Sequence, residues 1–108
     1  MDIMKKIINR RTGRHIEDPY EARVLIREVK RVYPFVQSDE HLAPHGRTSA
    51  FIAEKDLPAI REAHAGYICV FDGTFNCGFA GVKALYMGFK SLPEDFEARF
   101  PDYVVVGG

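Results

Sequence analysis

A cysteine stands shortly after the clearest predicted strand of the chain, at a position that would favour a reactive thiolate. Cys77 belongs to the run Asn76-Cys-Gly-Phe79, which opens a predicted helix. The unpaired N–H groups and the dipole of a helix N-terminus stabilise a thiolate, the nucleophilic form of cysteine. Such a nucleophile needs a histidine base and a group that orients the base. One hypothesis is therefore a cysteine-dependent enzyme with His45 or His64 as the base.

The order of these residues along the chain weighs against that enzyme. The Asn-Cys-Gly-Phe run resembles the active-site turn of papain-like cysteine peptidases, in most of which the histidine follows the cysteine. All four histidines here precede Cys77. A free cysteine is also commonly a small buried residue. We therefore expect a structural role for Cys77 and assign no catalytic residue.

The segment His41-Leu-Ala-Pro-His45-Gly-Arg-Thr-Ser49 offers a second kind of chemistry. Pro44 disfavours a helix that would place the two histidines on one face, and no further ligands follow at a regular spacing, so we expect no metal site. His45 and Arg47 could supply acid–base and charge-stabilising groups in a metal-independent nuclease. A polar surface loop is the simpler interpretation. Neither a dinucleotide nor a nucleoside-triphosphate motif is present in the sequence, so no cofactor is expected.

The distribution of charge indicates a binding surface instead. The chain has 15 basic and 15 acidic residues, and this zero net charge argues against a general nucleic-acid or membrane binder. The segment through Arg31 nevertheless has nine basic and five acidic residues. We expect its cations to meet an acidic protein surface. They are Arg10, Arg11, Arg14, Arg23, Arg27, Lys30 and Arg31.

The helix that would carry four of these cations is the best-defined predicted element. Asp18 is a favourable N-cap, Pro19 suits the first helical position and Glu21 occupies the capping-box position. Apolar residues then recur at helical spacing until Pro34 ends the pattern. The apolar side would face the core, and the opposite side would be cationic.

The remaining elements follow from the same signals of periodicity, capping and chain breaking. A Gly/Ala stripe in the helix that begins at residue 76 would allow tight packing or self-association through Gly81, Ala84 and Gly88. A loop is expected over residues 34–46, with one helical turn near residues 38–40. The other expected elements are helices over 2–8, 56–65, 76–89 and 91–100, and strands over 48–53, 67–71 and 102–106.

Together these elements predict one small α/β or α+β domain over residues 1–108, with residues 1–17 as a candidate flexible, basic segment. The expected order is α-α-β-α-β-α-α-β: two N-terminal helices, then a sheet of about three strands with helical crossovers. The C-terminal Gly107-Gly108 resembles the tail of ubiquitin-like sulfur carriers, but those folds open with a β-hairpin and this chain is expected to open with helices. We expect a flexible end there.

The function expected from the sequence is that of a small interaction or regulatory domain, of the inhibitor or adaptor kind. Its basic helix face would bind an acidic partner. The alternatives are the Cys77 enzyme and a nucleic-acid binder or nuclease that uses the basic N-terminal third with His45 and Arg47. No signal peptide or membrane span is expected, so the predicted location is the cytoplasm.

Overall fold

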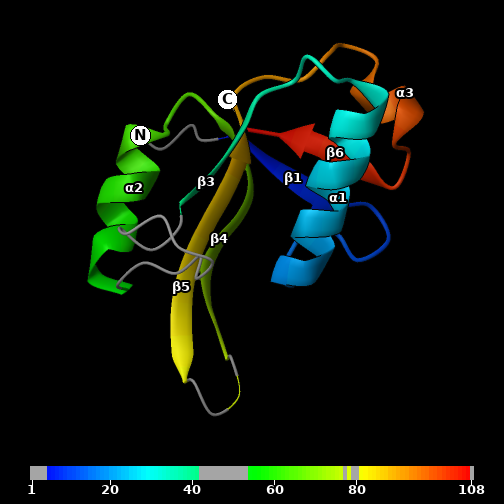
Figure 1. Ribbon diagram of the computed structural model, residues 1–108. Helices are drawn as coiled ribbons and strands as arrows, with labels where there is room; N and C mark the ends of the chain where they lie inside the picture. Colours follow the sequence, from blue (N-terminus) through cyan, green and yellow to red (C-terminus); the bar gives the residue numbers. More distant parts are fainter. Residues whose placement is uncertain (1–4, 42–53, 77, 79–80, 108) are drawn as a thin grey trace.

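A mixed six-stranded sheet with helices on both faces organises the chain (Figure 1). The computed structural model describes residues 5–41, 54–76, 78 and 81–107. The strands are β1 (Lys5–Asn9), β2 (Arg14–His15), β3 (Ser38–His41), β4 (Ile68–Asn76), β5 (Val82–Phe89) and β6 (Tyr103–Val106). The helices are α1 (Pro19–Val32), α2 (Leu57–Ala63), which follows a 3-10 turn over Glu54–Asp56, and α3 (Phe96–Arg99).

The first strand is central because three other strands pair with it. Lys6 pairs with Cys69 of β4 and with Val106 of β6, so these two strands lie on opposite edges of β1. Ile8 pairs with β2 and with β6, which places β2 on the same edge as β4. β1 and β4 are parallel, and the other pairings are antiparallel. The short strands β2 and β6 therefore flank β1 on opposite edges.

The β4–β5 hairpin is the longest pairing and extends beyond the rest of the sheet (Figure 1). A register shift between Cys69 and Phe71 leaves Val70 as an extra residue, which is the pattern of a β-bulge. On the outer edge of β5, β3 pairs antiparallel through Ser38–His41. The hairpin thus lies between α1 and α2, and its turn end projects from the molecule (Figure 1).

Alternation along β5 divides the interior into two hydrophobic layers. Leu85, Met87 and Phe89 belong to the large core that α1 and α3 cover. Ala84 and Tyr86 belong to a smaller cluster beneath α2. Because successive strand residues point to opposite faces, the two helices cover opposite sides of the sheet. Figure 1 shows α1 and α2 separated by the hairpin strands.

The N-cap, the proline at the helix start and most of the apolar spacing predicted for α1 are confirmed, whereas Glu21 bonds to Asn9 and Tyr103 and Val32 is exposed. The side chain of Asp18 accepts a hydrogen bond from the backbone N–H of Tyr20 at 2.9 Å, and Pro19 is the first helical residue. Ala22, Leu25, Ile26 and Val29 are buried, as their spacing predicts. The predicted helix over 56–65 and the strands over 67–71 and 102–106 correspond to α2, β4 and β6, while α3 is a short helix within 91–100.

The predicted fold class is wrong, because the chain begins with strands and its sheet has six strands rather than three. Residues 5–8 of the expected first helix lie in β1, where Ile7 is buried in the large core. The pairs Ile3-Met4 and Ile7-Ile8 fit a helix, but the segment pairs with residues 68–69 and 103–106, which lie far from it along the chain. Pairing of that kind leaves no local signal in the sequence.

The expected helix over 76–89 is also wrong. Tyr86 and Phe89, which a helix would place in one bulky stripe, face opposite sides of the sheet in β5. Gly78 and Gly81, which lie between the two strands, have φ values of 70° and 86°, and these suit the end of a hairpin better than the interior of a helix. The crossover architecture that this helix supported is therefore replaced by an antiparallel hairpin.

Two further expectations concern the segment between α1 and α2. The helical turn expected near residues 38–40 is instead the edge strand β3. The strand expected over 48–53 lies outside the described residues. None of the helices among the described residues is long and apolar enough to cross a membrane.

Candidate binding surface

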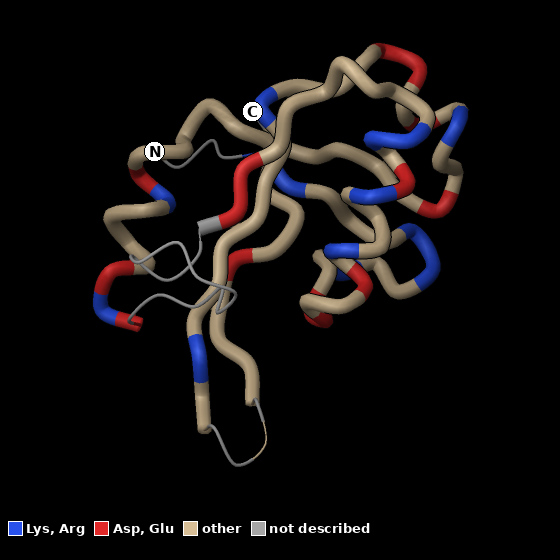
Figure 2. Tube along the Cα trace, in the orientation of Figure 1, with Lys and Arg blue, Asp and Glu red and all other residues tan. Residues whose placement is uncertain are grey.

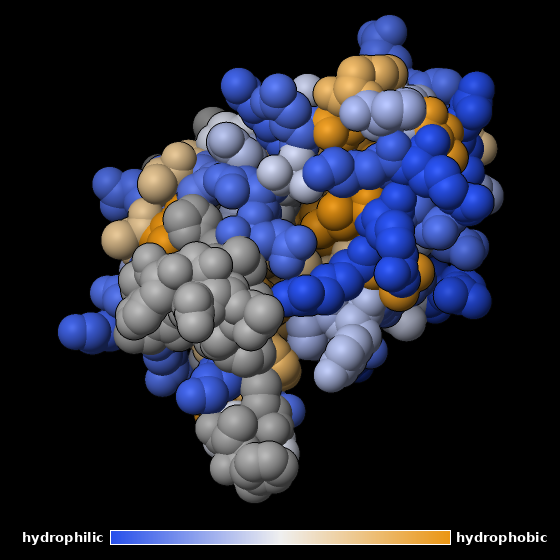
Figure 3. All heavy atoms as spheres, viewed as in Figure 1, coloured by the Kyte–Doolittle hydropathy of each residue, from blue (hydrophilic) through white to orange (hydrophobic). Residues whose placement is uncertain are grey.

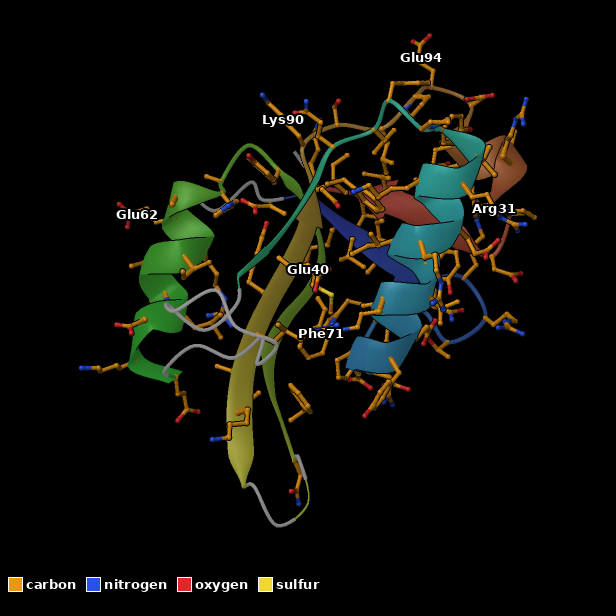
Figure 4. All side chains as sticks on the ribbon, viewed as in Figure 1. Arg31, Glu40, Glu62, Phe71, Lys90 and Glu94 are labelled. Atoms are coloured by element: carbon orange, nitrogen blue, oxygen red, sulfur yellow. The ribbon has the colours of Figure 1, made fainter. Side chains whose placement is uncertain are left out.

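The outward side of α1 combines exposed apolar residues with arginines. Tyr20, Val24, Arg27 and Arg31 follow one another at intervals of four, three and four residues, which aligns them along one side of a helix. Tyr20 is 76% exposed and Val24 is 46% exposed, so this side of the helix presents two neighbouring apolar side chains to the surface. We call these four residues the α1 face. In Figure 4, Arg31 projects away from the sheet.

Three of the four cations of α1 already have polar partners. Arg23 lies 3.5 Å from the carboxylate of Glu40 in β3, and Lys30 donates a hydrogen bond of 3.1 Å to Ser38. Arg31 forms an ion pair with Glu28 on the helix itself. Within the described part of the chain, Arg27 has no ion pair. Arg27 is thus the cation of the α1 face whose charge the described residues leave unbalanced.

Three arginines, two in the β1–β2 turn and one at the start of β2, form a second basic group. Asn9, which is buried, shapes this turn because its Oδ1 accepts a hydrogen bond from the backbone N–H of Arg11. Arg10 forms an ion pair with Glu97 at 3.5 Å, and Arg14 forms one with Glu17 at 3.8 Å. Figure 2 shows basic residues on this turn and on α1, whereas β3 is acidic. The turn therefore adds partly balanced charge to the surface.

A partly buried polar contact fixes the turn relative to α1. Oε2 of Glu21 accepts hydrogen bonds from Nδ2 of Asn9 at 3.1 Å and from the hydroxyl of Tyr103 at 2.9 Å. Burial and the hydrogen bond to Glu21 raise the pKa of Tyr103 to about 12. These contacts link β1, α1 and β6, so the sequence-predicted capping-box residue connects three elements.

A hollow of about 500 Å³ lies between the start of α1 and the β4–β5 hairpin. Sequence reasoning missed this site, although Tyr20 and Val24 stand out as apolar residues on the polar side of their helix. Figure 3 shows apolar atoms recessed between hydrophilic side chains beside α1. We call it the α1–hairpin hollow. Its described lining includes Pro19, Tyr20, Arg23, Phe75, Asn76 and Leu85.

The structure removes the helix on which the cysteine hypothesis depended. Cys77 lies outside the described residues, but Asn76 ends a strand and Val82 begins the next one. The other cysteine, Cys69, is buried, and this burial raises the pKa of its thiol to about 12. His45 and Arg47, the residues of the nuclease alternative, lie outside the described residues as well.

His64 has a set of contacts typical of a structural residue. It is 7% exposed, and its Nδ1 lies 2.9 Å from the carbonyl of Ile60. Its Nε2 lies 2.7 Å from Oδ2 of Asp39, so both ring nitrogens meet hydrogen-bond acceptors. The ring also contacts Tyr67 and Tyr86. These contacts join α2 to β3 and β5.

The predicted Gly/Ala stripe is divided by the strand geometry. Gly81 precedes β5, whereas Ala84 and Gly88 are buried within it. A Cβ atom at Gly88 would lie 2.5 Å from the hydroxyl oxygen of Tyr86 and 3.1 Å from the carbonyl of Ile68. The two buried positions therefore serve close packing inside the molecule.

The expectation that the chain opens with helices is wrong. That expectation was the reason to set aside the resemblance of Gly107-Gly108 to sulfur-carrier tails, but β1 and β2 form an antiparallel hairpin. Gly107 is exposed after β6.

Among the described residues, no three His, Cys, Asp or Glu side chains gather as a metal site.

Comparisons with known proteins identify no relative for this arrangement. No protein-family model, curated protein or solved structure matches the chain.

Proposed function

We propose that this domain binds another protein and that the α1 face is its contact surface. The observation that carries the proposal is the row Tyr20, Val24, Arg27 and Arg31 on one exposed side of a well-anchored helix. Tyrosine and arginine are enriched among the residues that dominate binding energy at protein interfaces. The partner surface would be acidic, because Arg27 lacks an internal counter-charge among the described residues.

The support of α1 favours a binding surface that is formed before the partner arrives. One side of the helix is buried in the large core, and Asp18 caps its first turn. Contacts of Glu21 and Arg23 hold the helix to β1, β6 and β3. A rigid helix loses little conformational entropy on binding, so more of the contact energy contributes to affinity.

Nucleic acid is the competing class of partner for an arginine-rich surface. Most of the basic residues here have acidic neighbours: Arg10, Arg14, Arg23 and Arg31 each form an ion pair with a carboxylate. Nucleic-acid affinity depends on neutralising several phosphates at once. These ion pairs would compete with phosphates, and this competition favours a protein partner with a few well-placed carboxylates.

Site-specific photo-crosslinking in the cells that produce the protein tests the proposal, and it works for a partner of any identity. A photoreactive amino acid would replace Val24 in one variant and Lys90, an exposed residue that Figure 4 shows away from α1, in the other. We expect a discrete protein adduct from position 24 and none of the same mass from position 90.

The outcomes of this experiment separate the classes of partner. An adduct at position 24 that nuclease digestion removes would favour nucleic acid over protein. Equal adducts at both positions, or none at position 24, would contradict the proposed surface. Either variant can be checked for folding by circular dichroism, since neither position contributes to the buried core.

A further inference from the structure

The α1–hairpin hollow has the size and lining of a pocket for a bulky side chain. Its volume of about 500 Å³ falls within the range common for ligand sites in proteins. Tyr20 borders it from α1, and Phe75 and Leu85 border it from the hairpin. Aromatic rings prefer edge-to-face or offset contacts with other rings, and Tyr20 and Phe75 supply one ring from each side of the hollow.

The polar residues of the hollow lie close to the unbalanced charge of α1. Arg23 borders the hollow and shares its charge with Glu40 at 3.5 Å. Arg27 follows one helical turn later and has no ion pair among the described residues. A chain segment that enters the hollow would therefore pass next to two guanidinium groups. Carboxylates flanking the inserted side chain would be held by charge-assisted hydrogen bonds.

We propose that the hollow is an anchor pocket for one aromatic side chain within an acidic segment of the partner protein. This inference rests on the proposed function of the α1 face, which it extends by naming the recognised chemistry. The aromatic ring would lie between Tyr20 and Phe75, and an adjacent carboxylate would meet Arg27. Anchors of this kind, buried in a pocket and surrounded by polar contacts, dominate the energy of many interfaces.

Selection from a phage-displayed library of random peptides against the full chain tests this recognition. We expect enriched peptides to share a Phe, Tyr or Trp next to Asp or Glu. Calorimetry with a synthetic copy of the best peptide should then show an affinity loss of about tenfold or more for Tyr20→Ala and Phe75→Ala. Phe35→Ala, which changes an aromatic residue 71% exposed outside the hollow, should bind within about twofold of the original chain.

The two levels of the proposal fail in different ways. Enriched peptides that are acidic but lack an aromatic residue, and that lose affinity with Arg27→Glu, would overturn the anchor and leave the α1 face as the binding surface. Aromatic peptides unaffected by Arg27→Glu and by Tyr20→Ala would overturn both. A library that yields no enriched sequence also overturns the anchor. If Phe75→Ala does not fold, Tyr20→Ala decides the question, because its side chain is largely exposed.

Discussion

Arg23 of α1 lies 3.5 Å from Glu40 of β3, and this contact joins the helix to the edge strand next to the α1–hairpin hollow. Both side chains are partly exposed, so the pair contributes no more than about 1 kcal/mol to stability. Its larger effect is on the surface charge, because Glu40 balances a cation that an acidic partner would otherwise contact. The ion pair therefore competes with binding.

This competition predicts a gain of affinity from removing an acid. Glu40→Gln should strengthen binding of an acidic partner about two- to fivefold, which corresponds to about 0.5–1 kcal/mol. Its free energy of unfolding should change by less than about 1 kcal/mol. Calorimetry at low salt measures the affinity. Weaker binding by Glu40→Gln would show that Glu40 itself contacts the partner and would reverse the charge assignment of this surface.

Close packing beneath α2 predicts that Gly88 tolerates no larger side chain. Gly88→Ala should lower the free energy of unfolding by about 1–3 kcal/mol, because its Cβ would overlap the hydroxyl of Tyr86. Urea denaturation measures the change. Gly66→Ala is the control, since no atom of the described residues beyond its two chain neighbours lies within 4 Å of that Cβ position, and it should stay within about 0.5 kcal/mol. Equal effects of the two substitutions would contradict the packing.

The buried thiol of Cys69 predicts a loss of stability at alkaline pH. Its pKa rises from 9.0 to about 12 in the folded chain, chiefly through burial. The unfolded chain therefore releases this proton first, so the contribution of Cys69 to stability is complete below about pH 9 and is lost as the pH rises towards 12.

Urea denaturation across this pH range measures the effect. Cys69→Ala should lose less stability than the original chain between neutral and alkaline pH, since other titrating groups are common to both. In a Cys77→Ser background, Cys69 is the only remaining thiol, and it should react with iodoacetamide in urea but not in the folded chain. Fast alkylation of the folded chain would contradict its burial.

The contacts of His64 predict a structural rather than a catalytic role. His64→Ala removes the hydrogen bonds of the ring to Asp39 and Ile60 and its contacts with Tyr67 and Tyr86, which should destabilise the chain by about 1–3 kcal/mol. His15→Ala, at an exposed position, should change stability by no more than about 0.5 kcal/mol. Thermal denaturation compares the two. An unchanged midpoint for His64→Ala would show that the ring does not hold α2 to the sheet.

How far the sequence predicts this fold depends on where each signal originates. The cap and periodicity of α1 are local, so Asp18 and Pro19 identify the helix without reference to the rest of the chain. β3 is different: its Ser38-Asp-Glu-His41 run has a low intrinsic strand preference, and pairing with β5 determines its structure. The strands β1, β3 and β5, whose structure depends on pairing with distant segments, were assigned to helices or to a helical turn.

The segment Val82–Phe89 shows how a strand buried on both faces misleads periodicity analysis. Leu85, Met87 and Phe89 face one layer, and Ala84 and Tyr86 face the other, so almost every position is apolar or small. A run of this kind fits a helix and a strand equally well. Gly78 and Gly81 before it were the better evidence, because both adopt left-handed φ values of 70° and 86°.

The candidate surface was predicted in part. The sequence indicated the cationic side of α1, but it treated Arg23 and Arg27 alike. Of these two, only Arg23 has a carboxylate neighbour on the adjacent strand β3 among the described residues. The hollow could not be predicted, because Tyr20 and Phe75 come from elements far apart in the sequence. Their proximity depends on the sheet topology, which local patterns in the sequence do not reveal.

The most direct test of the α1 face uses the partner protein that photo-crosslinking identifies, purified separately. The measurement is its affinity for two charge-reversed variants of this chain. Arg27→Glu and Lys90→Glu change the net charge equally, and both residues are exposed. If the α1 face is the binding surface, Arg27→Glu should weaken binding about tenfold or more, while Lys90→Glu should remain within about twofold of the original chain. Equal affinities for the two variants would contradict the proposed surface.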